Sequence, residues 1–387
     1  MAPAKLTILL SGMIAAVPHQ GGATWSVLQY LLGLGRLGHD VYFVEPVEES
    51  ALRPIGVPLA RTANAVYFRR VMAEFGLEQT SALLLTGTRQ TVGLPYERLR
   101  EVGGRADLLI NISGLLTDEA LTENISLRAY LDLDPAFNQL WHATQDIDMR
   151  FAGHNRFVTV GQAIGQPYCD VPTCGRKWIT TPQPVVLERW PVTRHITHDA
   201  LTTVANWRGY GSIEHEGVFY GQKAHSWRQF FTVPTLTGER FAPALAIHPE
   251  ESKDLAALRS NGWRLIDPAR VASSPDDYRR YIRGSKAEFG IAKSGYVSSR
   301  CGWLSDRSVC YLASGRPVIA QETGFSRFVS TGAGLFAFET IDDVLESIEA
   351  LKDDYERHAR SARTVAEEYF DSDKVLIRLL ERVGSTT

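Results

Sequence analysis

Residues 299–325 read SRCGWLSDRSVCYLASGRPVIAQETGF and form the most informative segment of the chain. The pattern predicts a glycine-containing loop, a helix that ends at Gly315, and a short strand at 317–320. The apolar run at 287–291 predicts a strand before the loop, so the segment is typical of a parallel α/β sheet. An ordinary βαβ turn without a ligand is the alternative interpretation.

The first turn of the predicted helix carries hydroxyls, a carboxylate and a guanidinium. After Gly302, the residues concerned are Ser305, Asp306, Arg307 and Ser308. The N-terminus of a helix presents free N–H groups, and its dipole favours anions. These groups predict a site for a pyrophosphate, although Asp306 also has a simpler explanation as the cap of the helix.

The rest of the C-terminal half of the sequence predicts one α/β domain that includes this segment. Further strands are expected at 202–205, 218–220, 244–247, 263–266 and 335–338. We expect this domain to span residues 201–365. Residues 366–387 carry apolar side chains at helical spacing and predict a terminal helix that docks back on the N-terminal domain.

The first half of the chain predicts a second domain of the same class. A strand at 6–10, a helix at about 24–37 and a strand at 41–44 form a βαβ opening, which implies a parallel sheet. Additional strands are expected at 82–85, 107–112, 129–133 and 156–160. We expect this domain to span residues 1–180, followed by a proline-rich linker at 181–200.

The loop after the first strand is a candidate ligand site. Gly21 and Gly22 would let the backbone approach an acceptor or a diphosphate at the carboxyl end of the sheet. His19 then lies at the mouth of the site and is a candidate catalytic base, with a solvated loop histidine as the alternative. Asp134 ends a predicted strand and could orient His19, or it could simply begin a helix together with Pro135.

A second glycine pattern, Gly33-Leu-Gly35-Arg-Leu-Gly38, has the letters of the G-x-G-x-x-G dinucleotide fingerprint. The fingerprint must follow a strand and open a helix, so that backbone N–H groups meet the pyrophosphate. Here the glycines close a predicted helix and precede a strand. We therefore interpret Gly38 as a left-handed helix stop.

The composition limits the partners and the compartment. Lys and Arg number 41 against 44 Asp and Glu, and the net charge of -3 argues against a nucleic-acid partner. The longest apolar stretch, at 6–17, is too short to span a bilayer, so no integral membrane contact is expected. The four cysteines lack the spacing of a zinc site or a disulfide framework, which predicts no metal and a cytoplasmic protein.

Three short motifs resemble the nucleotide-sugar signature of glycosyltransferases with the GT-B fold. They are Cys-Gly-Trp-Leu-Ser at 301–305, Gly-Arg-Pro-Val at 315–318 and Glu-Thr-Gly at 322–324. Plant natural-product members open the signature with H-C-G-W-N-S, and glycogen-synthase-like members end its helix with G-x-P-V-V. The resemblance implies an α/β fold of two doubly wound Rossmann-like domains that face each other across a cleft.

The resemblance also implies an activity. A sugar would pass from a nucleotide diphosphate donor, bound by the second domain, to a small-molecule acceptor in the first, with no metal and no cofactor. Glu322, Thr323 and Gly324 would touch the donor sugar. Arg208 and Lys223 resemble the arginine and lysine that glycogen-synthase-like members place on the diphosphate. A role in natural-product or glycan biosynthesis would follow.

Departures from the signature imply a divergent branch. The plant histidine is Arg300 here, and the asparagine is Leu304. The glutamate that would hold the ribose is Ser308 or Cys310, and Asp306 could substitute for it. A nucleotide-sugar epimerase-like enzyme on the same fold and a non-catalytic nucleotide-sugar-binding partner protein are the alternatives.

Overall fold

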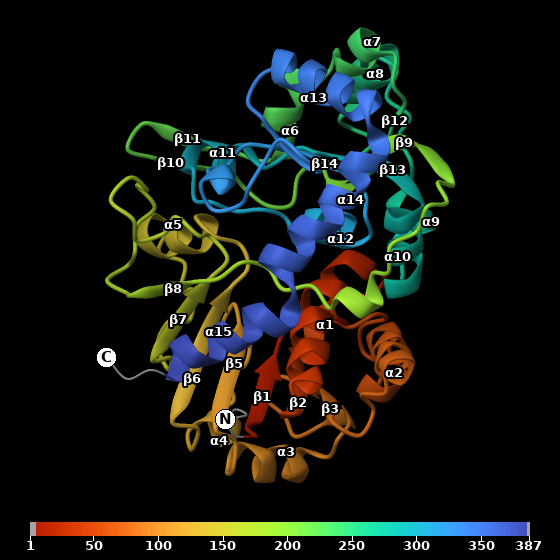
Figure 1. Cartoon of the computed structure of the whole chain (residues 1–387). Helices are drawn as coiled ribbons and strands as arrows, with labels where there is room; N and C mark the ends of the chain where they lie inside the picture. Colours follow the sequence, from red (N-terminus) through yellow and green to blue (C-terminus); the bar gives the residue numbers. More distant parts are fainter. Residues whose placement is uncertain (1–4, 385–387) are drawn as a thin grey trace.

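The computed structural model describes residues 5–384; residues 1–4 and 385–387, which the predicted ranges 1–180 and 366–387 include, lie outside the described part. Figure 1 shows two α/β lobes, one above the other. The N-terminal lobe contains a sheet in the order β4-β3-β2-β1-β5-β6-β7-β8, and the C-terminal lobe a sheet in the order β12-β9-β13-β14-β15. Neighbouring strands are parallel except β3 with β4. The expected α/β fold class is confirmed.

The first sheet is built around β1. Its strands are β1 Thr7–Ser11, β2 Asp40–Val47, β3 Ser81–Leu85, β4 Thr91–Gly93, β5 Leu108–Ile112, β6 Leu127–Asp132, β7 Arg156–Thr159 and β8 Trp178–Thr180. Its helices are α1 Gly21–Arg36, α2 Ala63–Phe75, α3 Tyr96–Gly103, α4 Glu119–Thr122 and α5 Phe137–Thr144. Ile8, Leu9 and Leu10 are completely buried, as expected for a parallel strand that is covered on both faces.

The second sheet carries the C-terminal lobe. Its strands are β9 His198–Asn206, β12 Phe241–Ala246, β13 Ser285–Gly290, β14 Val318–Gln321 and β15 Leu335–Phe338. Its helices are α6 Lys223–Trp227, α7 Val233–Thr237, α8 Ser252–Ser260, α9 Pro268–Val271, α10 Pro275–Gly284, α11 Ser294–Ser299, α12 Asp306–Ala313, α13 Ile341–Asp353 and α14 Tyr355–Val365. The last helix, α15 Ser372–Gly384, follows them in the chain.

Two segments of this lobe differ from their predicted structure. The strand predicted at 218–220 exists, but as β11 Val218–Tyr220 it pairs with β10 Ile213–His215 in an antiparallel hairpin outside the sheet. The strand predicted at 263–266 is wrong. That segment follows the edge strand β12 and forms only one bridge with it, between Ala244 and Ile266.

The chain crosses between the lobes twice. Between β8 and β9 it passes through the short helix η3 Leu187–Arg189, and after α14 it returns to α15, which lies against α1 and β6 of the N-terminal lobe (Figure 1). Gly33 permits this close approach, because a Cβ there would lie 2.5 Å from Leu376 Cδ1. Gly33 is thus a helix-packing residue, and the interpretation of Gly38 as a left-handed stop is confirmed by its φ of 89°.

A continuous hydrophobic core joins the lobes. It contains buried residues of α1, α10, α12, α14 and α15, together with Trp190 of the crossing segment. The ring centroids of Trp190 and Trp25 are 4.9 Å apart, and Trp25 Nε1 donates to the Pro275 carbonyl at 2.8 Å.

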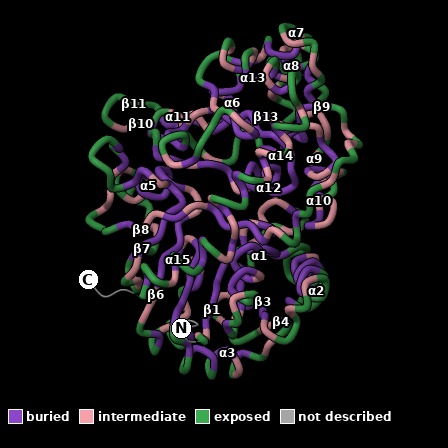
Figure 2. The backbone as a smooth tube through the Cα atoms, viewed as in Figure 1, coloured by how far each residue is buried: buried purple, intermediate pink, exposed green. Residues whose placement is uncertain are grey.

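Figure 2 shows burial along the central strands and exposure in the outer loops and helices. Within residues 5–384, no helix has the length and apolar character needed to cross a membrane.

Candidate functional site

The carboxyl ends of the C-terminal strands meet the N-terminus of α12 at a small cavity. Its lining residues are Gly290, Ile291, Ala292, Trp303, Leu304, Ser305, Arg307, Ser308, Ala320 and Gln321. Open α/β sheets bind ligands at the carboxyl ends of their strands, so this is the candidate site. The cavity volume of about 10 Å³ is at the lower limit for a single water molecule, so the site is closed to a larger ligand.

The first turn of α12 is capped by Ser305. Its Oγ accepts a hydrogen bond from the Arg307 N–H at 3.3 Å, so the alternative in which Asp306 caps the helix is wrong. Burial raises the pKa of Asp306, while the charge of Arg307 opposes the rise. Of the two positions considered for ribose binding, Ser308 lines the cavity, whereas Cys310 accepts a hydrogen bond from Gln29 of α1 at 3.7 Å.

Arg307 is a buried cation that lines the cavity and is only 8% exposed. Its Nε donates to Glu288 Oε1 at 2.5 Å, and its Nη1 donates to the Val204 carbonyl at 3.0 Å. Burial disfavours the charge of Arg307, but the Glu288 carboxylate raises its pKa above the ordinary value. Glu288 Oε2 is buried and has no hydrogen-bond partner among the described residues. The ion pair with Glu288 thus fixes the position of the Arg307 guanidinium.

Lys223 is close enough to Arg307 for the charge of Arg307 to act on it, whereas Arg208 pairs with a surface glutamate. Lys223 Nζ donates to the Ile291 carbonyl at 2.5 Å and lies 5.9 Å from the ring centroid of Trp303. Burial and the charges of Arg307 and Lys293 lower the pKa of Lys223 well below its ordinary value. Arg208 lies at the surface, where it forms an ion pair with Glu251. Of the predicted pair, only the lysine therefore contacts a residue that lines the cavity, Ile291.

Glu322, Thr323 and Gly324 fix the loop that precedes α12. Glu322 Oε1 accepts the N–H of Thr323 at 2.9 Å, and Gly324 also donates to it. Thr323 Oγ1 donates to the Trp303 carbonyl, and the Thr323 carbonyl accepts the Gly302 N–H at 2.8 Å. Glu322, Thr323 and Gly324, predicted to contact the donor sugar, and Gly302, a further predicted donor-binding residue, thus form hydrogen bonds within the protein that fix this loop.

Gly21 and Gly22 contact the C-terminal lobe, which overturns their predicted role. The Gly21 N–H donates to the Ala272 carbonyl at 2.8 Å, and a Cβ on Gly21 would lie 2.2 Å from the Ser274 carbonyl oxygen. A Cβ on Gly22 would lie 3.0 Å from the ring of Tyr278. Glycine is required at both positions because the start of α10 packs directly against the start of α1. This contact leaves no room for a ligand beside the two glycines.

His19 and Asp134 do not form the predicted dyad. His19 is exposed, and its ring packs edge-on against Tyr67 with centroids 5.1 Å apart. Asp134 instead forms an ion pair with Lys293 at 3.0 Å. The hypothesis that Asp134 orients His19 is therefore wrong, because the Asp134 carboxylate binds residues of the other lobe instead.

The group around Asp134, which we name the Asp134 cluster, consists of Asp134, Tyr210, Lys293 and Tyr296. Tyr210 donates to Asp134 Oδ2 at 2.5 Å, and Tyr296 donates to Oδ1. Burial raises the pKa of both tyrosines and lowers that of Lys293, whose shift Asp134 opposes. Asp134 follows β6 and Lys293 follows β13, so the carboxyl edges of the two sheets face each other here. Lys293 was not predicted from the sequence, although a lysine just after a buried strand is an available signal.

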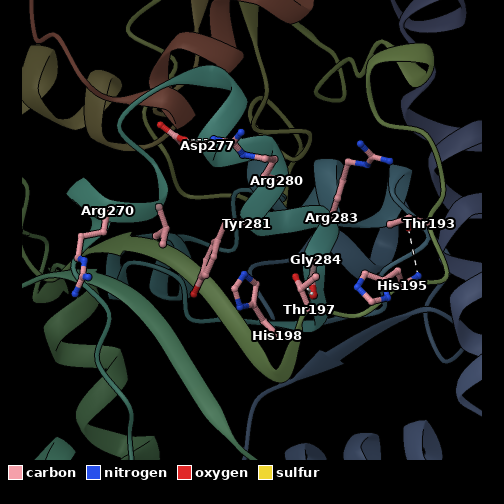
Figure 3. Close-up of a pocket in the computed structure, with 11 residues that line it drawn as sticks. Thr193, His195, Thr197, His198, Arg270, Asp277, Arg280, Tyr281, Arg283 and Gly284 are labelled. Carbon is pink, nitrogen blue, oxygen red and sulfur yellow. Dashed lines mark hydrogen bonds and ion pairs between the residues drawn. The ribbon is translucent and has the colours of Figure 1, made fainter.

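A larger cavity, of about 420 Å³, lies elsewhere in the C-terminal lobe (Figure 3). It is lined by His198 at the start of β9 and Gly284 just before β13, and therefore lies at the amino ends of the strands. In Figure 3 Arg280 lies against Asp277, with which it forms an ion pair, and Arg283 extends away from His198. The position at the amino ends argues against this cavity as the principal site. Among residues 5–384, no group of three or more His, Cys, Asp and Glu could hold a metal ion.

Comparisons with known proteins identify the fold. No family model matches the chain, and the comparison with curated proteins gives no match. An alpha-glucosyltransferase solved with UDP-glucose and DNA containing an abasic site is 12% identical, with a TM-score of 0.62 over 98% of both chains. Anabaena Alr3699/HepE with UDP-glucose is 11% identical (TM-score 0.59, 98% of this chain and 99% of that one). AviGT4, a glycosyltransferase of avilamycin A biosynthesis, is 14% identical (TM-score 0.55, 98% and 97%).

These similarities show that the chain has the fold of GT-B glycosyltransferases, as the sequence motifs implied. They also correct one prediction. The net charge of -3 predicts no nucleic-acid partner, yet alpha-glucosyltransferases of this fold were solved with DNA. The prediction is wrong because whole-chain charge does not describe the local surface that a ligand meets.

Proposed function

We propose that the protein is a glycosyltransferase that uses a nucleoside diphosphate sugar as donor, with uridine diphosphate sugars as the first candidates. The observation that carries the proposal is the convergence of the α12 N-terminus, Arg307 and Lys223 at the carboxyl edge of the second sheet. Support also comes from solved structures of the same fold that hold UDP or UDP-glucose.

The proposed reaction depends mainly on electrostatics. As the bond between sugar and diphosphate breaks, negative charge grows on the departing oxygen, and preorganised cations and N–H groups stabilise it. Arg307 and the α12 N-terminus would supply this stabilisation. Lys223 would join them, because an arriving diphosphate favours the charged form of the lysine, which burial disfavours by lowering its pKa. We propose that no divalent metal is required, so a chelator should leave turnover unchanged.

Donor binding requires the site to open. The described cavity measures about 10 Å³, whereas sites for small molecules usually measure about 300–1,000 Å³. The loop at 301–304 and the two lobes would separate to admit the donor and close over it afterwards. Closure would exclude water, which protects the donor from hydrolysis.

The acceptor would bind in front of the N-terminal lobe, near the exposed His19. The loop that carries His19 is fixed by Glu45, whose carboxylate accepts the N–H groups of Ala15 and Ala16 at 2.7 and 2.6 Å. We propose His19 as the acceptor-side base if the reaction inverts the configuration of the anomeric carbon, and as a binding group if the reaction retains that configuration.

The four cysteine thiols are free, which fits a reducing cytoplasmic location.

The test is a turnover assay with UDP-glucose and related donors, in which released UDP and the fate of the sugar are measured. Acceptors include hydroxyl compounds from glycan and natural-product biosynthesis and a DNA duplex, since solved structures of this fold include DNA complexes. A transferase releases UDP together with a glycosylated acceptor. An epimerase-like enzyme alters the sugar without an acceptor, and a binding protein leaves it unchanged. Either of the last two results, or no binding of any donor, contradicts the proposal.

A further inference from the structure

The Asp134 cluster connects the two lobes at the rim of the candidate donor site. Lys293 Nζ lies 3.0 Å from both carboxylate oxygens of Asp134, and it also contacts the hydroxyls of Tyr210 and Tyr296. The side chains of Asp134 and Lys293 are 26% and 18% exposed, so solvent screens the pair only in part. The carboxylate of one lobe and the ammonium of the other therefore balance each other's charge.

Lys293 is also adjacent to the donor cavity. It directly follows Ile291 and Ala292, both of which line that cavity. The ring of Tyr296, one turn further along, stacks on Trp303 with centroids 4.3 Å apart, and Trp303 is a further wall residue. Lys223, bound to the Ile291 carbonyl, is close enough for its charge to be affected by that of Lys293. The ammonium of Lys293 therefore bonds to Asp134, while the two residues just before Lys293 line the place proposed for the diphosphate.

These contacts set up a competition for one ammonium group. A diphosphate carries more negative charge than a single carboxylate, and lysine has a flexible stem whose ammonium can reorient toward it. Asp134 retains the two tyrosine hydroxyls as donors when the ammonium leaves, so its carboxylate stays hydrogen-bonded. We propose, on the basis of the proposed function, that Lys293 exchanges partners: it pairs with Asp134 in the empty protein and with the donor diphosphate in the loaded protein.

The exchange makes Asp134 a competitor of the donor. Asp134→Asn removes the competing charge, so UDP should bind more tightly, by about threefold to tenfold. Lys293→Met removes the cation and should weaken UDP binding roughly tenfold, the value of one charge-assisted hydrogen bond. In the double variant, Asp134→Asn should no longer tighten binding, because the ammonium for which Asp134 competes is absent. Lys374→Met, an exposed lysine of α15, should bind UDP as the wild type does.

Calorimetric titration of the full chain with UDP measures these affinities, and thermal unfolding shows whether each variant folds. If Asp134→Asn leaves the affinity unchanged or lowers it, the Asp134–Lys293 pair is only a contact between lobes and the inference is wrong. If the wild type binds no nucleoside diphosphate, the proposed function fails as well.

A second measurement does not depend on the aspartate variant. In the full chain labelled with ¹⁵N-lysine, the Lys293 Nζ resonance, assigned with Lys293→Arg, should shift when UDP is added. An unchanged resonance at saturating UDP would overturn the exchange.

Discussion

Arg307 combines a structural contact with a proposed ligand contact. Glu288 balances its buried charge, and removal of one partner of such a pair costs about 3–5 kcal/mol because the other charge remains uncompensated. We expect Arg307→Met to lower the free energy of unfolding by about 3 kcal/mol and to abolish UDP binding. Urea unfolding and calorimetric titration measure the two effects.

The double variant Glu288→Gln/Arg307→Met separates the two roles of this arginine. Neither buried charge remains in it, so most of the stability should return, while UDP binding should stay absent. Binding of UDP at the wild-type affinity by this double variant would show that the guanidinium takes no part in the donor site.

Glu45 makes stability depend on pH. Burial raises its pKa from 4.5 to about 7, although the N–H groups of Ala15 and Ala16 oppose the rise. Between about pH 4.5 and pH 7, Glu45 of the folded protein therefore retains a proton that the unfolded chain has lost. The stabilisation is complete below about pH 4.5 and disappears as pH rises through about 7.

Glu45→Gln should remove this dependence. Between about pH 5 and pH 8 the wild type should lose about 2 kcal/mol of unfolding free energy relative to the variant. Urea unfolding of both proteins at the two pH values measures the difference. Parallel changes in the two proteins would show that Glu45 titrates normally.

The junction between α1 and α10 is the element most sensitive to added volume. A methyl group on Gly21 would meet the backbone of Ser274 at 2.2 Å, and backbone cannot move aside as a flexible side chain can. We expect Gly21→Ala to destabilise the protein by about 2–3 kcal/mol. Gly35 of the same helix has no atom within 4 Å of its added Cβ, so Gly35→Ala should stabilise by about 0.5–1 kcal/mol. Equal melting temperatures for the two variants would contradict this account of α1.

The elements themselves follow from local sequence patterns. Continuous apolar runs mark the buried parallel strands, and the serine before 306–313 marks the start of α12, because strands and helix caps are set by neighbouring residues. The short strands β4 and β8 were missed because three residues carry no periodicity. The segment 263–266 was misread, because an apolar run beside an edge strand has the same composition as a strand.

The site was less predictable because its contacts join distant parts of the sequence. Ser305, Arg307 and Ser308 are brought together by one helix turn, so the sequence located them at the cavity. The partner of Asp134 lies 159 residues away in the other lobe, and no local pattern specifies that pairing. Gly21 was misassigned for the same reason, since the backbone that it contacts belongs to a different lobe.

At the scale of the whole molecule, aromatic contacts join the two lobes. Phe137 of the N-terminal lobe packs against Tyr210 and Tyr296 of the C-terminal lobe, with ring centroids 5.0 and 5.6 Å away. We expect Phe137→Ala to lower stability by about 3–4 kcal/mol and to speed UDP association several-fold, because the lobes separate more easily. Stopped-flow binding measures the rate.

Phe151→Ala is the matched control for the cleft. Phe151 is as buried as Phe137, but its ring contacts stay within the N-terminal lobe, with Tyr130, Phe157 and Trp178. This variant should lose similar stability without a change in association rate. If both variants bind UDP at the same association rate, separation of the lobes is not the slow step of binding.

A crystal structure of the chain grown with UDP examines the donor site directly. The diphosphate should lie within hydrogen-bonding distance of the first N–H groups of α12, of Arg307 and of Lys223, with the loop at 301–304 displaced from its closed position. UDP bound only at the amino ends of the strands, beside His198, or no bound UDP at saturating concentration, would contradict the assignment of α12 as the diphosphate site.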